Sequence, residues 1–134
     1  LNRMWLSDDC PRCSESRCLS YAFKYIKRRF PKIGWVQSFA DERCGALGVV
    51  YQAANFGYYG THTSTFWELG GVMYHNIAMT RKNGAPAEAH LQANKHLAIK
   101  HRFRQFRYLY FIKKQAKRDV ILARQPYPKR GTTP

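Results

Sequence analysis

Hydrophobic and polar positions over the first 41 residues predict a strand, a helix and a second strand. Two apolar runs of strand length cover residues 1–6 and 35–41. Between them, residues 15–30 place apolar side chains at helical spacing on one face. These apolar positions are Leu19, Ala22, Phe23, Ile26 and Phe30. Because a helix crosses between the two strands, we expect the strands to be parallel neighbours in one sheet.

The ends of this helix are marked by the residues that flank it. Ser14 is a candidate N-cap, and Glu15 favours the positive end of the helix dipole. Pro31 cannot continue a helix and stops it. We therefore expect Leu19 and Phe23, with Ile26, to be buried against the sheet.

The remaining sequence predicts further strands and helices. In order, these are a short helix in residues 48–56, a strand at 58–69, a return strand at 72–79, a helix at 86–99 and a strand at 101–112. The Gly70-Gly71 pair predicts a hairpin turn between the two middle strands. The helix at 86–99 should carry Ala89, Ala93 and Leu97 on one face. We expect the last ten residues to be loosely held.

This order of elements predicts the α/β class, more closely α+β: a mixed, twisted sheet with flanking helices. We expect one domain over residues 1–112, with residues 113–134 as a basic C-terminal extension of the same domain. A length of 134 residues and a hydrophobic share of 45% suit a single domain of ordinary size.

The formal net charge of +15 indicates the kind of binding partner rather than the fold. It favours nucleic acid or, less often, an anionic membrane. Residues 95–130 hold twelve Lys and Arg but one acid, Asp119. Although charge runs are often only solvated faces, this density predicts binding to double-stranded DNA. The candidate DNA-binding residues are Lys100, Arg102, Arg104, Arg107, Lys113, Lys114, Lys117 and Arg118. Because no apolar run approaches the ~20 residues of a bilayer span and no signal peptide is visible, we expect a cytoplasmic protein without membrane contact.

Polar residues lie where the predicted strands end, which is the edge where α/β sheets bind ligands. Ser14, Ser16 and Arg17 start the first helix, whose free N–H groups favour an anion, and Arg12 could add a charge. The alternative is that Ser14 only caps the helix and Arg17 is solvated. Asp41 ends the second strand, where it could serve chemistry, cap the next turn or pair with a neighbouring arginine.

Two other positions leave similar alternatives open. Arg3 lies in an apolar strand, which suggests an acidic or substrate partner unless it faces water at a sheet edge. Tyr51, in the second helix, could transfer a proton or could be an aromatic residue at the edge of the core. Asn55 is better explained as a helix C-terminal residue than as a catalyst.

Metal binding is a weaker hypothesis. Cys10 and Cys13 have C-x-x-C spacing, but Cys18 and Cys44 form no second pair, so ordinary reduced thiols are expected. His62 and His75 lie on the two hairpin strands and could face each other across them to bind a metal. Lone histidines are more often simple polar strand residues. The spacing indicates no metal site.

Four stretches carry a resemblance to a known family: RMWLSDDCPRCSESR, WVQSFADERCG, GVVYQAANFGYYG and KHRFRQFRYLYF. Their order resembles the second half of a GNAT-type acyltransferase and, more specifically, the Mom family of bacteriophage DNA-modification proteins. The resemblance covers nearly the whole chain. It implies transfer of a carbamoylmethyl group to the exocyclic amine of adenine in phage DNA, which shields that DNA from host restriction.

The resemblance also implies roles for individual residues. Ser16 and Arg17 would hold the donor, Asp41 would engage the adenine amine, Tyr51 would act as a general acid, and Arg3 would complete the site. Arg12 and Ser14 would join them at the donor, and we expect Ser16, Asp41 and Tyr51 to converge in one cleft.

The donor would be of acyl type, with acetyl-coenzyme A as the candidate, although residues 12–16 replace the glycines of the usual GNAT pyrophosphate loop. Because a complete GNAT domain has elements before residue 1, a second chain could supply the N-terminal half. The alternatives are a basic DNA-binding module without chemistry of its own, and a metal-dependent nucleic-acid-binding protein that uses Cys10 and Cys13.

Overall fold

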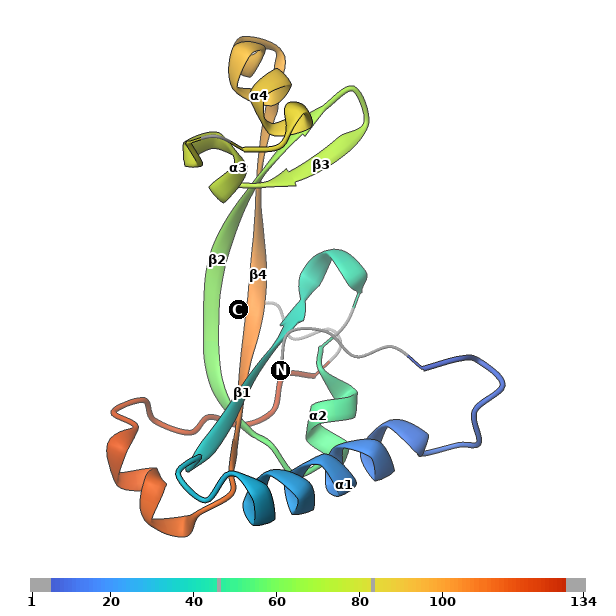
Figure 1. Ribbon diagram of the computed structural model, residues 1–134, viewed down its shortest axis with the longest axis vertical. Coiled ribbons are helices and arrows are strands. Elements are labelled where there is room, and N and C mark those ends of the chain that lie inside the picture. The colour runs from blue at the N-terminus through green and yellow to red at the C-terminus, as the bar shows by residue number, and fades with distance from the viewer. Residues whose placement is uncertain (1–5, 46, 83, 130–134) are drawn as a thin grey trace. The chain divides into compact units, whose positions relative to one another are not determined.

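The computed structural model describes residues 6–45, 47–82 and 84–129. The predicted strand at 1–6 falls almost wholly outside these residues, and so do Arg3 and the predicted parallel pairing. The α+β class is confirmed. Four strands form one sheet in the order β1-β4-β2-β3, and neighbouring strands run antiparallel (Figure 1).

The chain divides into two compact units. The first comprises residues 1–61 and 106–134, and the second comprises residues 62–105. The two long strands, β2 (Gly57–Leu69) and β4 (Ile99–Phe111), each contribute to both units. The remaining elements of the first unit are α1 (Ser14–Arg29), β1 (Trp35–Asp41), α2 (Val49–Ala53) and two short 3-10 helices, η1 (Glu42–Cys44) and η3 (Lys114–Asp119).

The first helix and strand closely follow the hydrophobic pattern. β1 has the predicted bounds, and α1 begins and ends one residue before them. Leu19 and Phe23 are buried as predicted, whereas Ile26 is half-buried. The N-cap assignment was wrong. Cys13 occupies that position with a left-handed backbone (φ 68°), and it makes no side-chain cap hydrogen bond.

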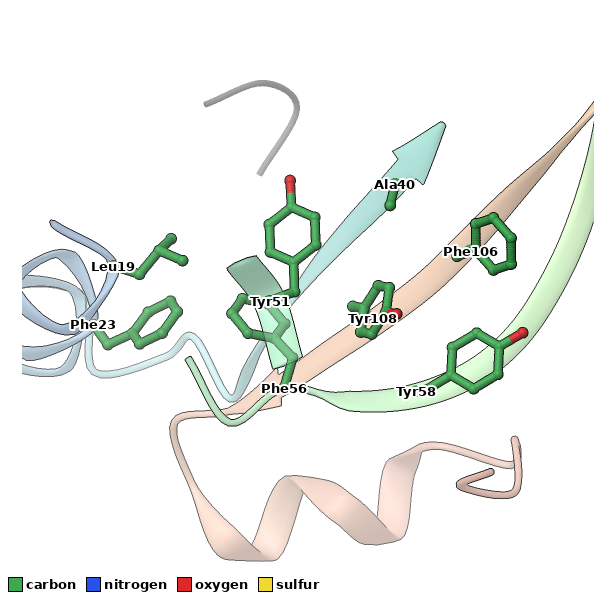
Figure 2. Close-up of a cluster of buried hydrophobic side chains, with 8 residues drawn as sticks. All are labelled: Leu19, Phe23, Ala40, Tyr51, Phe56, Tyr58, Phe106 and Tyr108. Carbon is green, nitrogen blue, oxygen red and sulfur yellow. The ribbon is translucent and has the colours of Figure 1, made fainter. Parts of the chain in front are cut away.

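Aromatic side chains dominate the core of the first unit (Figure 2). The buried cluster consists of Leu19, Phe23, Ala40, Tyr51, Phe56, Tyr58, Phe106 and Tyr108. Alternate residues of β4 enter it, as expected for a strand with one face toward a core. On its border the rings of Phe23 and Tyr110 stack with centroids 4.0 Å apart, which joins α1 to the end of β4.

Tyr108 connects the start of α2 to the sheet. Its hydroxyl donates to the carbonyl oxygen of Leu47 and accepts a hydrogen bond from Gln52 Nε2 at 3.0 Å. Gln52 Nε2 also donates to the same Leu47 oxygen at 3.2 Å. Gly48, the N-cap of α2, has φ 73° and lies directly against the Tyr108 ring. The turn into α2 is therefore fixed by hydrogen bonds and by close packing on one side chain.

The C-terminal segment is held more firmly than predicted. Gln125 N–H donates to the carbonyl oxygen of Tyr58 at 2.8 Å and forms an isolated β-bridge with it. The Tyr127 hydroxyl donates to the carbonyl oxygen of Phe56 at 2.5 Å. The expectation of ten loose terminal residues was therefore wrong for Gln125 and Tyr127, because backbone pairing and a tyrosine anchor hold them.

The second unit is built on the predicted hairpin. Gly70 and Gly71 both have positive φ, and β3 (Val72–His75) pairs antiparallel with β2 in the register Phe66↔His75 to Leu69↔Val72. The return strand is shorter than predicted, because α3 (Ile77–Thr80) takes up the second half of that run.

The helix predicted at 86–99 is also shorter than expected. It ends at Ala93 as α4 (Pro86–Ala93) and is followed by a 3-10 helix, η2 (Lys95–Leu97). Leu91 is its fully buried residue, whereas Ala89, Ala93 and Leu97 are exposed. The predicted apolar face was therefore wrong. None of the helices in the described part of the chain has the length and apolarity that a bilayer crossing requires.

Candidate functional site

The first turn of α1 directs its serine hydroxyls back to carbonyl groups of the preceding loop. Ser14 Oγ donates to the carbonyl oxygen of Pro11 at 2.6 Å, and Ser16 Oγ donates to that of Cys13 at 3.0 Å. Arg12 and Arg17 are exposed. The Ser14 N–H donates to the carbonyl oxygen of Pro11 at 3.1 Å. Because α1 has no side-chain cap, the helix dipole and the next N–H groups of its first turn still favour an anion.

A groove lies alongside α1 in the first unit and has a volume of about 440 Å³. We call it the α1–α2 groove, because α1 and the end of α2 line most of it, together with the end of β4. Its lining residues are Ser16, Ser20, Phe23, Lys24, Lys27, Ala53, Ala54, Asn55, Tyr110 and Ile112. Ser16 is thus the one predicted site residue that lines it.

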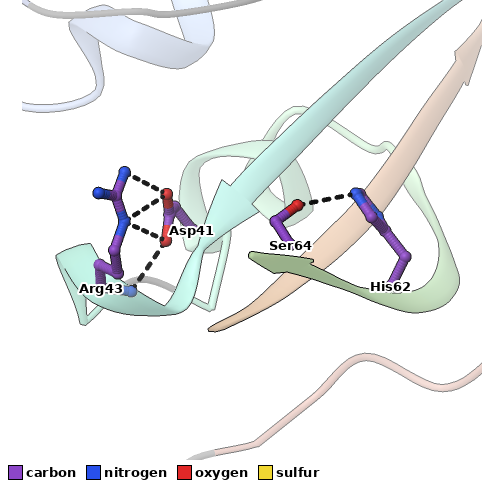
Figure 3. A network of polar contacts seen from close by, with 4 residues as sticks. All are labelled: Asp41, Arg43, His62 and Ser64. Atoms are coloured by element: carbon purple, nitrogen blue, oxygen red, sulfur yellow. Dashed lines mark hydrogen bonds and ion pairs between the residues drawn. The ribbon is translucent and has the colours of Figure 1, made fainter. Parts of the chain in front are cut away.

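Asp41 forms an ion pair with Arg43 at the end of β1 (Figure 3). The carboxylate accepts hydrogen bonds from the Arg43 backbone N–H at 3.0 Å and from the guanidinium at 2.9–3.3 Å. Partial burial by itself raises the pKa of Asp41, but the hydrogen bonds and charge of Arg43 outweigh it and hold that pKa below its usual value. The alternative of a pairing and turn-capping residue is therefore confirmed, and the carboxylate is ionised at neutral pH.

Tyr51 belongs to the aromatic core. Its ring centroid lies 5.3 Å from that of Phe56 and 5.5 Å from that of Tyr108. Its hydroxyl points away from both rings (Figure 2). A core position with an outward hydroxyl fits the alternative of a core-edge aromatic residue.

The predicted convergence of Ser16, Asp41 and Tyr51 in one cleft stays a prediction. Of these three, Ser16 lines the α1–α2 groove, and the other two do not. Arg3 lies outside the described residues.

The candidate DNA-binding residues fall in both units. Lys100, Arg102 and Arg104 belong to the second unit. Those in the first unit are Arg107, Lys113, Lys114, Lys117 and Arg118. Two of the cations lie over aromatic rings within their own unit: Arg107 lies 5.8 Å from the Phe39 centroid, and Lys100 lies 5.6 Å from that of Trp67. Three of the lysines, Lys113, Lys114 and Lys117, are exposed.

The histidine pair proposed for a metal does not form. His75 lies opposite Phe66 in the hairpin register and packs edge-on against that ring. His62 contacts Ser64 Oγ through Nε2 at 3.4 Å (Figure 3). The four cysteines are free and exposed, and no group of three or more metal-ligating side chains is found in the described part of the chain.

Sequence reasoning missed most residues of the α1–α2 groove. Ser20, Lys24 and Lys27 were not singled out as site residues, although their spacing continues from Ser16 along one side of α1. That spacing was the available signal. Asn55, predicted to be a helix C-terminal residue, lies just beyond Ala54, the C-cap of α2, and it too lines the groove.

The chain was compared with known proteins. It matches the model of the Mom protein family over residues 1–129. It is 53% identical over 133 residues to the protein named "Methylcarbamoylase mom" from Escherichia phage Mu. The match covers 96% of this chain and 55% of that relative, so the chain spans about half of the relative's length. With a family match across both compact units, the chain belongs to the Mom protein family.

Proposed function

We propose that this chain forms part of an enzyme that transfers a carbamoylmethyl group to the exocyclic amine of adenine in phage DNA. The observation that carries this proposal is the 53% identity to a relative named a methylcarbamoylase. The net charge of +15 supports a polyanionic substrate. In this proposal the modification shields phage DNA from host restriction enzymes in the host cytoplasm.

The chemistry of Asp41 supports a positioning role. A carboxylate whose pKa is held down by Arg43 is a weak base at neutral pH, but it is a strong hydrogen-bond acceptor. We therefore propose that Asp41 orients the adenine amine. Since the amine is buried in a duplex, the enzyme would have to flip the base out of the stack.

Tyr51 and the start of α1 would complete the site. The Tyr51 phenol would give a proton to the leaving group, because its hydroxyl points out of the aromatic core. Ser16, Arg17 and the first turn of α1 would hold an anionic part of the donor, aided by Arg12, Ser14 and Arg3. The donor would carry the carbamoylmethyl group on a leaving group, which departs as the adenine nitrogen bonds to the methylene carbon.

Mass spectrometry of nucleosides tests the proposal. The chain is expressed alone, and also together with a segment that supplies the part of the relative that the chain does not span. The expected result is a modified deoxyadenosine in DNA from at least one of the two cultures. Failure of both to modify adenine would contradict the assignment.

Matched variants locate the chemistry. Asp41→Asn and Tyr51→Phe should each reduce modification by about tenfold or more, which is the usual contribution of general acid–base or orienting groups. The controls Asp119→Asn and Tyr21→Phe change the same atoms at exposed positions and should modify DNA at the unmutated rate. Equal rates in all four variants would assign Asp41 and Tyr51 to structure.

A second candidate is a basic DNA-binding module without chemistry of its own. It is favoured by the formal net charge of +15, which supports binding to a polyanion without requiring any catalytic residue. Under this alternative the chain binds DNA, and Asp41→Asn and Tyr51→Phe alter neither binding nor any modification measured in the presence of the added segment.

A further inference from the structure

Two adjacent aliphatic side chains, Ile121 and Leu122, lie in water on a loop of the first unit, and we call them the apolar pair. Ile121 is fully exposed (102%), more than any other large hydrophobic residue in the described part of the chain, and Leu122 is 44% exposed. Single exposed aliphatic residues are ordinary on protein surfaces, but an adjacent pair forgoes the free energy that burial of both would provide. The apolar pair is therefore a candidate contact for a binding partner.

The loop that carries the apolar pair is fixed at both ends. On its N-terminal side, η3 packs beside the start of β1 through Ala116, which is buried and lies directly against Gly34. On its C-terminal side, Gln125 forms a β-bridge with Tyr58. Only residues 120–124 separate η3 from this bridge. The first unit thus holds the apolar pair at a defined place with its side chains in solvent.

Cationic residues flank the apolar pair on both sides in the sequence. Residues 113–124 hold five Lys and Arg but one acid, Asp119. The ion pairs found among the described residues involve none of these cations. The segment around the apolar pair should therefore attract a polyanion. Its exposed cations are Lys113, Lys114, Lys117 and Arg118 before the pair, and Arg124 after it.

Duplex DNA is the partner that fits this combination of charge and apolar surface. Proteins that distort DNA neutralise its phosphates with Lys and Arg, and they insert Ile, Leu or other apolar side chains between base steps. An enzyme that reaches an adenine amine must extrude the base, which leaves a gap in the stack. An apolar side chain that fills the gap offsets part of the cost of extrusion and is itself removed from water.

A membrane surface matches the same observations less well. Segments that bind a bilayer surface immerse the apolar face of an amphipathic helix, so their affinity scales with buried apolar area. The helix next to the apolar pair, η3, has six residues, and its buried residue, Ala116, packs against the chain itself. Two aliphatic side chains match the size of one base step but give little area to a bilayer.

We propose that Ile121 and Leu122 form a wedge that enters the base stack of duplex DNA and fills the gap left by an extruded adenine, while the flanking cations contact phosphates. This inference rests on the proposed function, because it requires that an adenine leave the duplex. The wedge has a positioning role, since aliphatic side chains carry no group that reacts.

Binding to a duplex with one abasic site tests the wedge. An abasic site opposite thymine presents a gap that costs no base extrusion, so the unmutated chain should bind it about tenfold more tightly than the intact duplex. Fluorescence anisotropy at one ionic strength measures both affinities. In the double variant Ile121→Ser, Leu122→Ser the preference should fall to about twofold or less, because all charges are kept but the wedge is lost. A preference that is absent from the unmutated chain, or unchanged in the variant, would overturn the proposal.

Two further double variants separate a wedge from surface hydrophobicity in general. The control Leu97→Ser, Ile99→Ser removes the same residue types from positions in the second unit that are 63% and 60% exposed. It should keep the preference for the abasic duplex, and so should Ile121→Val, Leu122→Met, which leaves an apolar wedge in place. Thermal midpoints should match that of the unmutated chain, as expected for exposed positions. An equal loss of preference in the control would overturn the proposal.

Vesicles of phosphatidylserine and phosphatidylcholine test the membrane as the partner. Co-sedimentation with them should be the same for the serine variant of the apolar pair and for its control, because only charge attracts the chain to this surface. Weaker sedimentation of the serine variant alone, together with an unchanged preference for the abasic duplex, would make the apolar pair a membrane contact and overturn the proposal.

The binding experiment requires no group transfer, so its failure is distinct from failure of the proposed function. If modified deoxyadenosine is found but the preference for the abasic duplex does not depend on the apolar pair, the modification stands and the wedge is overturned. If the preference depends on the apolar pair but neither culture contains modified deoxyadenosine, the proposed transfer is wrong and the wedge is supported as a DNA contact.

Discussion

Tyr108 is a residue at which packing, hydrogen bonding and ionisation are linked. It is fully buried in the aromatic cluster, yet its hydroxyl bonds to Leu47 and Gln52. Burial raises the pKa of Tyr108 to about 12, although the hydrogen bond from Gln52 opposes the rise. The neutral phenol is thus the form that the folded chain accommodates.

The first prediction concerns Tyr108→Phe. The variant should be less stable by about 1–2 kcal/mol at neutral pH, because a buried hydrogen-bond partner is lost. Since the folded pKa lies above the unfolded value, the stabilisation is complete below pH 10 and is lost as pH rises toward 12. The stability gap between the two proteins should shrink by about 1.4 kcal/mol between pH 9 and 11. Urea titrations at both pH values measure it, and a constant gap would contradict the raised pKa.

The second prediction concerns Gly48→Ala. An added Cβ would lie 2.8 Å from Tyr108 Cζ and 3.1 Å from Ala40 Cβ, on a backbone with φ 73°. The control Gly45→Ala has a similar φ of 62°, and its Cβ meets nothing within 4 Å. Both variants carry the backbone strain of about 1–2 kcal/mol. Gly48→Ala alone adds overpacking, so it should lose roughly a further 1–3 kcal/mol in chemical denaturation. Equal losses of stability in the two variants would show that the Tyr108 ring can move away from the added Cβ at little cost.

Asp41 shows what residue type alone leaves undecided. A carboxylate at a strand end suits chemistry, turn capping and ion pairing equally, and only the position of Arg43 two residues on selects among them. The local sequence does not indicate the role of Tyr108, because its hydrogen bonds join residues more than fifty positions away.

Elements with one strong period were predicted well. α1 has a regular apolar face and a following proline, and β1 has a compact apolar run, so their bounds were nearly correct. Segments with mixed signals were not. Alanine at 89 and 93 extends a helical pattern, but α4 ends at Ala93, and its core contact is Leu91. The local sequence pattern does not show which face of a helix packs against another element.

The third prediction tests the packing of α1. Phe23→Ala removes a ring that stacks on Tyr110 and contacts Phe56. The free energy of unfolding should fall by about 3–4 kcal/mol, as for other buried aromatic truncations. The control Tyr21→Ala truncates a ring that is 71% exposed on the same helix, and it should change stability by less than about 0.5 kcal/mol. Similar losses for both would mean that α1 is not anchored by its apolar face.

At the scale of the whole molecule, charge is the property that sequence conveys most directly. The net charge of +15 follows from counting charged residues and does not depend on the fold. What counting cannot supply is position. The predicted DNA-binding residues divide between two compact units, because β4 carries some of them into each.

The fourth prediction concerns binding to duplex DNA. Affinity should fall steeply with salt, because each phosphate contact releases counterions and contributes about 0.9 to the slope of log K against log salt. The triple variant Lys113→Gln, Lys114→Gln, Lys117→Gln should lower that slope by roughly 2 or more. Fluorescence anisotropy at several salt concentrations measures it.

The control for this experiment removes three charges elsewhere: Arg28→Gln, Arg29→Gln, Lys32→Gln. These residues are exposed at and beyond the end of α1. The control should keep the slope of the unmutated chain. If both triple variants changed the slope equally, attraction would follow net charge rather than a defined surface, and a flat salt dependence of the unmutated chain would exclude the DNA contact altogether.

The close approach of Gly48 to Tyr108 also sets a rule for how this family can diverge. No side chain fits at position 48 while a full tyrosine ring lies against it. A lineage that replaces the glycine must therefore shrink residue 108 as well, and it then loses the hydroxyl that holds Leu47. Aligned relatives should show the two positions changing together, with glycine retained wherever tyrosine is. Many relatives with a bulky residue at 48 beside an intact tyrosine would refute this coupling.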